Sequence, residues 1–261
     1  MPQLLNEIET NEVPRYVTSD DWWLQEKHNG ERAMIEVRAH HATGINRSGL
    51  RKPLPTAIAK AAAQLDDCIL DGEKVGDEFW AFDCLEHKGM DLRPLPLSER
   101  DAILKLKIGM GFLRGSPAIH LVKSFTTTQQ KCAAVEQLTR DNAEGFVLKR
   151  HDARYTPDRP GRYGTWLKYK YWASASCIVI GPNGDKSSAR IMVLKDGKPV
   201  EVGAVTIHGN KVFPKKGEII EVRYLYCGPG GRLVQPTYEA KRDDVRPQDC
   251  TWKQLKHMRP H

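Results

Sequence analysis

Apolar residues recur at helical spacing in three stretches before residue 140. An alanine-rich stretch over 57–65 follows a proline and a threonine, which together form a typical helix start. The second stretch, 98–106, opens with a serine and a carboxylate at the spacing of a capping box. The third, 128–138, has apolar residues at Cys132, Val135 and Leu138. We therefore predict three helices in this part of the chain.

Short apolar runs bounded by glycine or charged residues predict strands between these helices. The runs cover 33–37, 68–70, 79–85 and 145–148. Residues 166–170 alternate, so both lysines of this run are expected on the same face of a strand. Because strands and helices do not strictly alternate along the chain, the pattern predicts a mixed α and β domain of the α+β class.

The pattern changes after residue 172, where strand signals replace helix signals. Turns rich in glycine, proline and asparagine separate the expected strands. These strands cover 177–180, 191–194, 200–205, 219–226 and 233–238. Five short strands are typical of a small barrel such as the oligonucleotide-binding (OB) fold. We place the boundary between the two domains near 171–173.

The composition is that of a folded globular protein with excess positive charge. Hydrophobic residues make up 40% and charged residues 28% of the 261 positions, and the formal net charge is +7 at pH 7. This balance favours a polyanionic partner only where the basic residues converge on one site.

The sequence carries no signal for secretion, membrane insertion or structural zinc. The N-terminus lacks a basic segment followed by an apolar run, and no stretch approaches the roughly 18 apolar residues that span a bilayer. The six cysteines show no pair at the two-residue spacing of a zinc knuckle. We therefore expect a cytoplasmic protein with reduced, mostly buried thiols and no membrane contact.

Residues 25–32, Gln-Glu-Lys-His-Asn-Gly-Glu-Arg, are the first candidate for chemistry. The glycine allows the backbone to come close to a ligand, and Arg32 offers a planar fork for phosphate oxygens. Lys27 is a nucleophile when its amine is unprotonated, which desolvation and neighbouring cations favour. By itself, this pattern is weak and is more typical of a solvated basic turn.

Five further segments carry groups suited to nucleotide chemistry. Residues 46–49 place a second arginine in a turn, and 70–73 place two carboxylates at a strand end. Residues 79–83 offer aromatic faces for a base, and 144–149 combine a carboxylate, a glycine, apolar residues and a cation. The two lysines of 166–170 complete the series.

In this order, the segments resemble the motifs of the covalent nucleotidyltransferases. This superfamily comprises ATP-dependent DNA ligases, RNA ligases and mRNA capping enzymes. The resemblance runs from Lys27 to Lys170, with a last element near Arg242. It implies an adenylation domain with a mixed α/β, ATP-grasp-like fold over 1–172, followed by an OB-fold domain over 173–261.

The resemblance also implies a nucleotide-binding role for a defined set of residues. Lys27 would attack the α-phosphate of ATP to form lysyl-AMP, Glu73 would bind the ribose hydroxyls, and Phe82 would stack on adenine. Phe79 and Trp80 are alternatives for the stacking ring. The other nucleotide-binding residues would be Gln25, Arg32, Arg47, Glu144, Lys149, Lys168, Lys170 and Arg242, the last of which would orient the departing pyrophosphate.

The same resemblance implies catalytic cations and a metal ion around the nucleophile. Arg32, Lys168 and Lys170 would act on the reacting phosphate. Glu73 and Glu144 supply oxygen ligands that suit Mg²⁺, with Mn²⁺ as an alternative. Positioning and charge neutralisation would then account for most of the catalysis.

The implied activity is that of a monomeric ATP-dependent DNA ligase that seals nicks in double-stranded DNA through lysyl-AMP and DNA-adenylate. The two domains would close around the nick by a hinge near 171–174, without a long clamp-like loop. The expected DNA contacts are Arg32, Arg47, Lys186, Arg190, Lys211, Lys215 and Lys216. ATP is expected rather than NAD, because few residues precede the nucleophile and the chain lacks the cysteine cluster of the NAD-dependent enzymes.

Three other functions are compatible with parts of the pattern. An RNA ligase is disfavoured, because the Lys-x-x-Gly-x-Arg form ending at Arg32 is typical of DNA ligases. A GTP-dependent mRNA capping guanylyltransferase shares the lysine motif and the barrel. A non-catalytic OB-fold protein would bind nucleic acid without chemistry at Lys27. Asn29 departs from the aspartate that most DNA ligases carry at this position.

Overall fold

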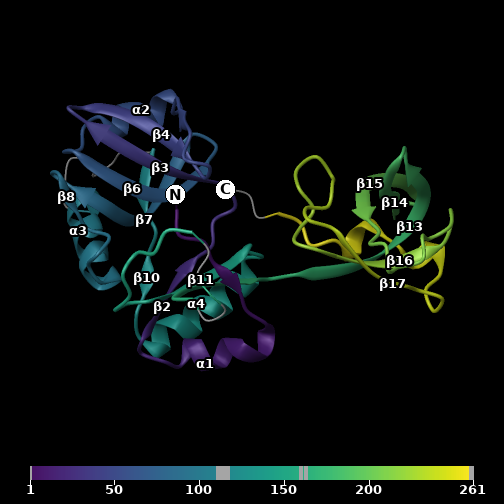
Figure 1. The fold of residues 1–261 in the computed structure, drawn as a ribbon. Coiled ribbons are helices and arrows are strands. Elements are labelled where there is room, and N and C mark those ends of the chain that lie inside the picture. The colour runs from purple at the N-terminus through teal and green to yellow at the C-terminus, as the bar shows by residue number, and fades with distance from the viewer. Residues whose placement is uncertain (1, 110–117, 159–160, 162–163, 259–261) are drawn as a thin grey trace. The chain divides into compact units, whose positions relative to one another are not determined.

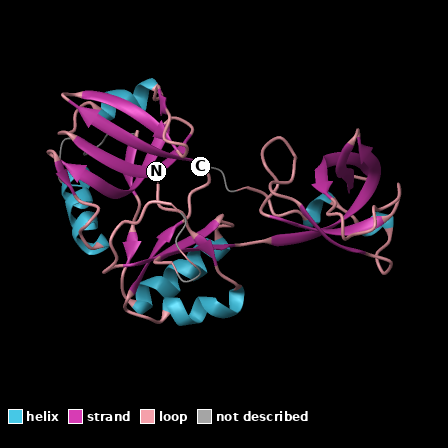
Figure 2. Ribbon diagram, viewed as in Figure 1, coloured by secondary structure: helices cyan, strands magenta, loops and turns pink. Residues whose placement is uncertain are grey.

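The computed structural model describes residues 2–109, 118–158, 161 and 164–258. The chain divides into two compact units (Figure 1). The first comprises Met1–Arg140 and Gly145–Tyr169, and the second comprises Asp141–Glu144 and Lys170–His261. Both units are rich in strands (Figure 2). No helix among the described residues has the length and apolar character needed to cross a membrane.

The larger sheet of the first unit has seven strands. Its hydrogen-bonded order is β5-β4-β3-β6-β7-β8, and β9 pairs with β7 in parallel. The strands are β3 (Glu31–Arg38), β4 (His41–Asn46), β5 (Arg51–Lys52), β6 (Cys68–Val75), β7 (Glu78–His87), β8 (Met90–Asp91) and β9 (Ile119–Leu121). The strands predicted over 33–37, 68–70 and 79–85 are confirmed within β3, β6 and β7.

Two helices pack on one face of this sheet, α2 (Thr56–Ala62) and α3 (Leu97–Gly109) (Figure 1). Ile58 and Leu104 of the helices share a fully buried core with Phe79 of the sheet. Burying one such side chain stabilises the fold by about 1.5–3 kcal/mol. Both helices were predicted from their apolar spacing.

Helix α3 begins differently from the predicted capping box. The amides of Leu97 and Ser98 donate to the carbonyls of Ala153 and His151 respectively. A distant loop therefore satisfies donors that a local side chain was expected to satisfy.

The smaller sheet of the first unit has five strands in the order β1-β12-β11-β2-β10. They are β1 (Asn6–Glu7), β2 (Trp22–Glu26), β10 (Ser124–Phe125), β11 (Gly145–Arg150) and β12 (Trp166–Lys170). The short helices η1 (Thr10–Glu12) and α1 (Val13–Val17) precede β2, and α4 (Thr128–Arg140) precedes β11. The predicted strands 145–148 and 166–170 are confirmed. The end of β12, Lys170, already belongs to the second unit.

The buried face of α4 differs from the prediction. Cys132 is exposed, whereas Lys131, Ala134 and Leu138 are buried. The Lys131 ammonium donates to the backbone carbonyls of Ser19 and Trp22. Because these carbonyls satisfy the ammonium, a lysine takes the inward position that apolar periodicity assigned to its neighbour. All six cysteines are free and, Cys132 apart, buried.

The second unit contains a closed five-stranded barrel, as predicted, in the order β13-β14-β15-β17-β16. Its strands are β13 (Ala173–Asn183), β14 (Lys186–Lys195), β15 (Lys198–Thr206), β16 (Ile219–Tyr224) and β17 (Thr237–Lys241). The fifth strand begins later than predicted, so that the predicted range 233–238 overlaps it only at Thr237 and Tyr238. Pro236 has no N–H to donate, and the ladder starts only after it, where Thr237 pairs with Thr206 and Arg223. Two short helices follow, η2 (Pro247–Asp249) and η3 (Trp252–Gln254).

Candidate active site

An open pocket lies in the first unit, lined by residues from both of its sheets. Six residues expected at the nucleotide line it together. They are Gln25, Lys27, Arg32, Glu73, Phe82 and Lys149. The remaining lining residues are Leu5, Glu26, His28, Val147 and Trp166. Segments far apart in the sequence thus converge on one cavity.

Lys27 lies directly after β2, where the backbone is fixed from the neighbouring strand. Its amide donates to the carbonyl of Gly145 at 3.1 Å. Gly145 has φ 156°, a conformation that residues with a side chain rarely adopt. The glycine of the 144–149 segment therefore shapes the strand that holds the nucleophile's backbone.

Gly30, the glycine of the lysine motif, has a packing role. A Cβ atom at this position would lie 2.2 Å from the carbonyl oxygen of Lys74 in β6. The sequence led us to expect a close approach to a ligand here. The structure instead shows a close approach between two backbone segments of the same unit.

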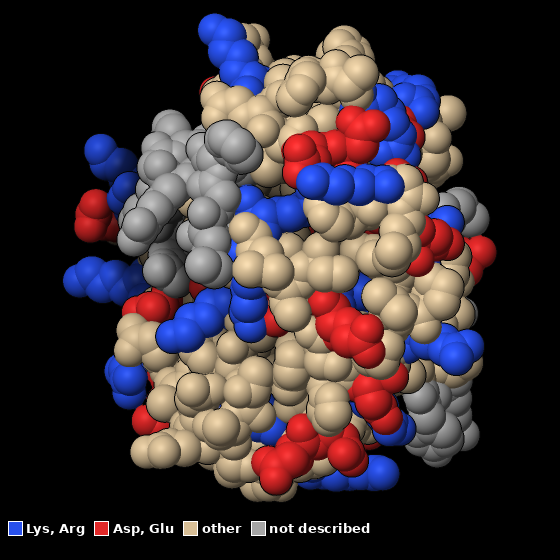
Figure 3. Space-filling view, turned by 90° about the vertical axis from the view of Figure 1, so that its left-hand side faces the viewer, with Lys and Arg blue, Asp and Glu red and all other residues tan. Residues whose placement is uncertain are grey.

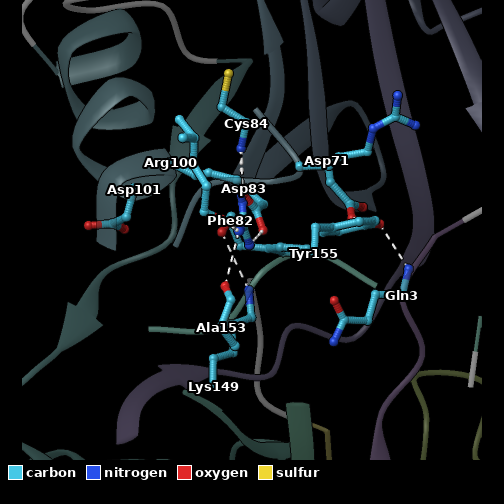
Figure 4. Close-up of polar contacts among 12 residues, drawn as sticks. Gln3, Asp71, Phe82, Asp83, Cys84, Arg100, Asp101, Lys149, Ala153 and Tyr155 are labelled. Carbon is cyan, nitrogen blue, oxygen red and sulfur yellow. Dashed lines mark hydrogen bonds and ion pairs between the residues drawn. The ribbon is translucent and has the colours of Figure 1, made fainter. Parts of the chain in front are cut away.

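A buried ion pair holds Arg32 against the pocket wall (Figure 4 shows its partner Asp71). Its Nε and Nη2 atoms donate to the two carboxylate oxygens of Asp71, each at 2.7 Å. Asp71 is fully buried and also accepts a hydrogen bond from the hydroxyl of Tyr155 at 2.8 Å. Burial alone would lower the pKa of Arg32, but the Asp71 carboxylate outweighs it and raises that pKa. Arg32 is thus a fixed positive charge.

The two carboxylates of the 70–73 segment have different environments. Asp71 and Glu73 are two positions apart on β6, and their side chains leave the same face of the strand. Asp71 forms the ion pair with Arg32, whereas Glu73 lines the pocket. Glu73 is therefore the carboxylate of this segment that contributes to the pocket lining.

A register shift in the sheet directs Phe82 toward the pocket. Asp71 pairs with Asp83 and Gly72 pairs with Ala81, so that Phe82 is an extra residue in β7. Phe79 is fully buried in the core. Among the three aromatic candidates, Phe82 alone lines the pocket.

Trp80, the third aromatic candidate, lies in a stack of rings. It stacks against His28 at 4.2 Å and against His120 at 4.5 Å between ring centroids. Two imidazole rings therefore already pack against it, one of which, that of His28, belongs to the pocket lining.

Lys149 is a buried cation held by aromatic rings. Its Nζ atom lies 4.2 Å from the centroid of the Phe82 ring and 3.9 Å from that of Trp166. Burial lowers the pKa of Lys149 to about 7, and the Asp83 carboxylate opposes this shift. The ammonium therefore exchanges its proton near neutral pH, unlike an exposed lysine.

A second buried ion pair lies behind the pocket, between Arg100 of α3 and Asp83 of β7 (Figure 4). Both side chains are fully buried, and two hydrogen bonds of 2.8 Å join them. Arg100 also donates to the carbonyls of Leu95 and Ala153. Neither ion pair was predicted. Asp71 and Asp83 were inside recognised segments, but no pattern in the sequence indicated that Arg100 or Tyr155 would face them.

The other expected nucleotide-binding residues do not line this pocket. Arg47 lines a separate pocket with Pro2, Leu4, Ser48 and Asp158. Lys168 pairs with Glu7 at 3.4 Å. In the second unit, Glu144 is buried, and Lys170 donates to the side chain of Gln235 at 2.8 Å. Arg242 forms ion pairs with Asp244 and Glu221.

The residues present fit a metal that uses few protein ligands. Glu73 offers carboxylate oxygens in the pocket. Among the described residues, no group of three or more His, Cys, Asp or Glu side chains forms a site by itself. Mg²⁺ commonly uses one or two carboxylates together with phosphate oxygens and water. The pocket therefore suits a metal that arrives with a phosphate ligand.

The basic residues proposed for DNA differ in their surroundings. Lys186, Lys215 and Lys216 are exposed, and the last two belong to a loop that also exposes 88% of Val212. Arg190 is paired with Glu201 at 2.5 Å, and Lys211 donates to the carbonyl of Glu239. On the face drawn in Figure 3, basic and acidic side chains are interspersed.

Comparison with known proteins connects the pocket to a family. Residues 74–170, which contribute Phe82, Val147, Lys149 and Trp166 to the lining, match the family model described as ATP dependent DNA ligase domain. This part of the chain is similar to the ATP-dependent DNA ligases. The chain is 24% identical to the bifunctional non-homologous end joining protein LigD of Bacillus subtilis over an alignment that covers 83% of this chain and 42% of the relative. The chain thus spans less than half the length of the curated relatives it matches.

Solved structures show that the fold is that of DNA ligases. A structure from a study of DNA binding by Lig E DNA ligases has a TM-score of 0.67 and 17% identity, covering 92% of this chain and 98% of that chain. A mycobacterial DNA ligase D, described as complexed with ATP and MES, has a TM-score of 0.54 and 22% identity, covering 96% of this chain and 97% of the other. These ligase folds cover nearly the whole chain.

Proposed function

We propose that this protein is an ATP-dependent DNA ligase that seals nicks in double-stranded DNA. The observation that carries the proposal is the convergence of Lys27 with five other expected nucleotide-binding residues on one pocket. The match of 74–170 to the family model of ATP-dependent DNA ligases supports the proposal. In this proposal, 1–172 is the adenylation domain and 173–261 is an OB-fold domain.

ATP would occupy the pocket beside Lys27. The Phe82 ring offers a surface for adenine, and the Glu73 carboxylate can accept hydrogen bonds from the ribose hydroxyls. Arg32, fixed by Asp71, supplies positive charge at the wall without reorganisation. That a related mycobacterial ligase is described in complex with ATP supports this choice of nucleotide.

The reaction would proceed in three phosphoryl-type transfers. The unprotonated Lys27 amine attacks the α-phosphorus, a P–N bond forms, the bond to pyrophosphate breaks, and the amine loses a proton. The 5′-phosphate at the nick then takes the adenylate from Lys27. Finally the 3′-hydroxyl attacks that phosphate and releases AMP. Each step develops charge on phosphate oxygens, so a fixed cation such as Arg32 would lower its barrier, as would Lys149 in its protonated form.

Glu73 and, by the resemblance, Glu144 would hold Mg²⁺, or Mn²⁺ in its place. The metal would neutralise charge on the phosphate oxygens. The carboxylates themselves would orient the nucleotide relative to Lys27 through these contacts. Of these two carboxylates, Glu73 lines the pocket, whereas Glu144 belongs to the second unit.

Residues outside the pocket would join the reaction through domain motion. Arg242 would bind the pyrophosphate during the first step, and it would have to exchange its ion pairs with Asp244 and Glu221 for that contact. Arg47, Lys168 and Lys170 would contact phosphate groups of nucleotide or DNA. Lys186, Arg190, Lys211, Lys215 and Lys216 would contact the DNA backbone. We propose a cytoplasmic monomer.

Labelling with radioactive ATP tests the proposal directly. Wild-type protein incubated with α-labelled ATP and Mg²⁺ should acquire a label that survives denaturation, and nicked duplex DNA should then be sealed. Lys27→Ala should acquire none, while Lys60→Ala, at an exposed position on α2, should label normally. Arg242→Ala should label more slowly than wild type. Labelling by GTP alone would instead support a capping enzyme, and an unlabelled wild-type protein would refute the proposal.

A further inference from the structure

The segment after the last barrel strand, 250–258, is fastened to the second unit at several points. The amide of Leu194 donates to the carbonyl of Cys250 at 2.7 Å. The side-chain amide of Gln254 forms two hydrogen bonds, each 3.0 Å, with the backbone of Ser176 in β13. Gln254 thereby pairs with this strand as a neighbouring backbone would. The segment is therefore held to the barrel rather than loosely attached.

Lys256 occupies a fixed position within this segment. Its backbone amide donates to the hydroxyl of Tyr224 at 2.8 Å, and its carbonyl accepts from the amide of Cys227 at 2.7 Å. The preceding residue, Leu255, is buried in the barrel core. With its backbone bound on both sides, Lys256 can direct its side chain to a defined place.

The Lys256 side chain reaches the segments that enter the second unit from the first. Its half-buried Nζ atom donates to the carbonyl of Tyr171 at 2.8 Å and to that of Ala143 at 3.2 Å. The Tyr171 amide in turn donates to the carbonyl of Glu144 at 3.0 Å. One ammonium therefore bridges the two segments, 141–144 and 170–171, beside Glu144.

We infer that Lys256 is a positioning residue that fixes the backbone of Glu144 through the carbonyls of Ala143 and Tyr171. The inference rests on the proposed function in one respect, namely the assignment of Glu144 to the metal. A carboxylate can hold a metal well only if its own backbone is held, and groups that orient a ligand typically affect metal affinity 10–100-fold. Lys256 would act in this way from the C-terminal end of the chain.

Hydrogen exchange on the full-length protein without nucleotide tests the positioning itself. Lys256→Met retains the apolar stem but removes all donors. Amide exchange should accelerate about tenfold in peptides covering 141–146 and 168–173 and stay unchanged in the strands of the first unit outside these peptides. Lys253→Met, at an exposed position in the same segment, is the matched control and should exchange as wild type does. Lys256→Arg should restore most of the protection.

Magnesium dependence tests the consequence for the metal. The Mg²⁺ concentration for half-maximal adenylation should rise about tenfold in Lys256→Met, with the rate at saturating Mg²⁺ close to that of wild type. The inference is overturned if exchange at 141–146 stays unchanged, if exchange accelerates equally throughout the barrel, or if Mg²⁺ dependence does not move. If wild-type protein forms no adduct at all, the proposed function fails, and the exchange result alone decides whether Lys256 positions Glu144.

Discussion

The two units place their candidate functional residues in opposite environments. In the first unit, buried carboxylates hold cations in and behind the pocket: Asp71 is fully buried against Arg32, and Asp83 is fully buried against Arg100. In the second unit, Arg242 has a side chain that is 32% exposed, and its partner Asp244 is 69% exposed. The cations in and behind the pocket of the first unit are thus already fixed before any ligand binds. In the second unit, Arg242 is held in an ion pair at the surface.

The difference shows which interactions can be exchanged for a ligand. Separating a buried ion pair leaves an uncompensated charge in a medium of low polarity, at a large cost in free energy. Separating an exposed pair costs little, because water replaces the lost partner. We therefore expect the pocket wall to stay fixed through the reaction while Arg242 changes partners.

The largest effect is expected at the buried ion pair between Asp83 and Arg100. Asp83→Asn keeps the shape of the side chain but leaves the Arg100 charge uncompensated. We expect the free energy of unfolding to fall by about 3–5 kcal/mol, because both groups are fully buried. Urea unfolding followed by tryptophan fluorescence would measure the change.

The matched control is the exposed pair between Arg190 and Glu201 of the barrel. Glu201→Gln makes the same chemical change as Asp83→Asn, but in solvent, so the unfolding midpoint should stay where it is. A loss of stability in both variants, or in neither, would remove the distinction between the two units.

A smaller effect on stability is expected from the protonation of Lys149, which is buried in the pocket wall. Its pKa is about 7 in the folded protein and near 10.5 in an exposed lysine, so between these values the unfolded chain binds one more proton. Stability contributed by this group therefore rises with pH above about 7, by about 1 kcal/mol per pH unit. Below about pH 7, both states are protonated and the burial cost is constant.

Comparison of wild type with Lys149→Met isolates this contribution. Other buried lysines, such as Lys131, titrate in both proteins and cancel in the difference. Urea unfolding at about pH 6 and about pH 9 should show wild type gaining stability relative to the variant at the higher pH. A difference that stays constant over this range would mean that Lys149 titrates as an exposed lysine does.

Four of the barrel strands and the helices α2, α3 and α4 of the first unit were predictable because each depends on local periodicity. The prediction failed where a distant group decided the outcome. The backbone carbonyls of Ser19 and Trp22 allow Lys131 to be buried, and the carbonyls of His151 and Ala153 start α3. Such partners are separated in sequence from the residues they satisfy, so no local pattern reveals them.

Residues of the pocket lining could be predicted where a sequence motif specifies the type of residue at each of its positions. Lys27, Glu73 and Phe82 were named from such motifs and line one pocket. The supporting groups were not predictable, because a buried aspartate is indistinguishable in sequence from a solvated one. That Phe82 rather than Trp80 faces the pocket depends on a register shift between β6 and β7, which a single strand sequence does not encode.

The smallest effect is expected at the exposed lysines of the barrel loop. Lys215 and Lys216 lie beside exposed apolar residues of the same loop, where they can reach a phosphate backbone without giving up a buried partner. If both neutralise phosphates, the double variant Lys215→Ala/Lys216→Ala should reduce the salt dependence of binding to nicked duplex by about two in the slope of log K against log salt. Fluorescence anisotropy of adenylated protein from about 50 to about 200 mM salt would measure it. Lys60→Ala, which removes one exposed charge from the first unit, should leave the slope unchanged. An equal change of slope in both variants would mean that the effect depends on net charge and that the loop makes no specific contact with DNA.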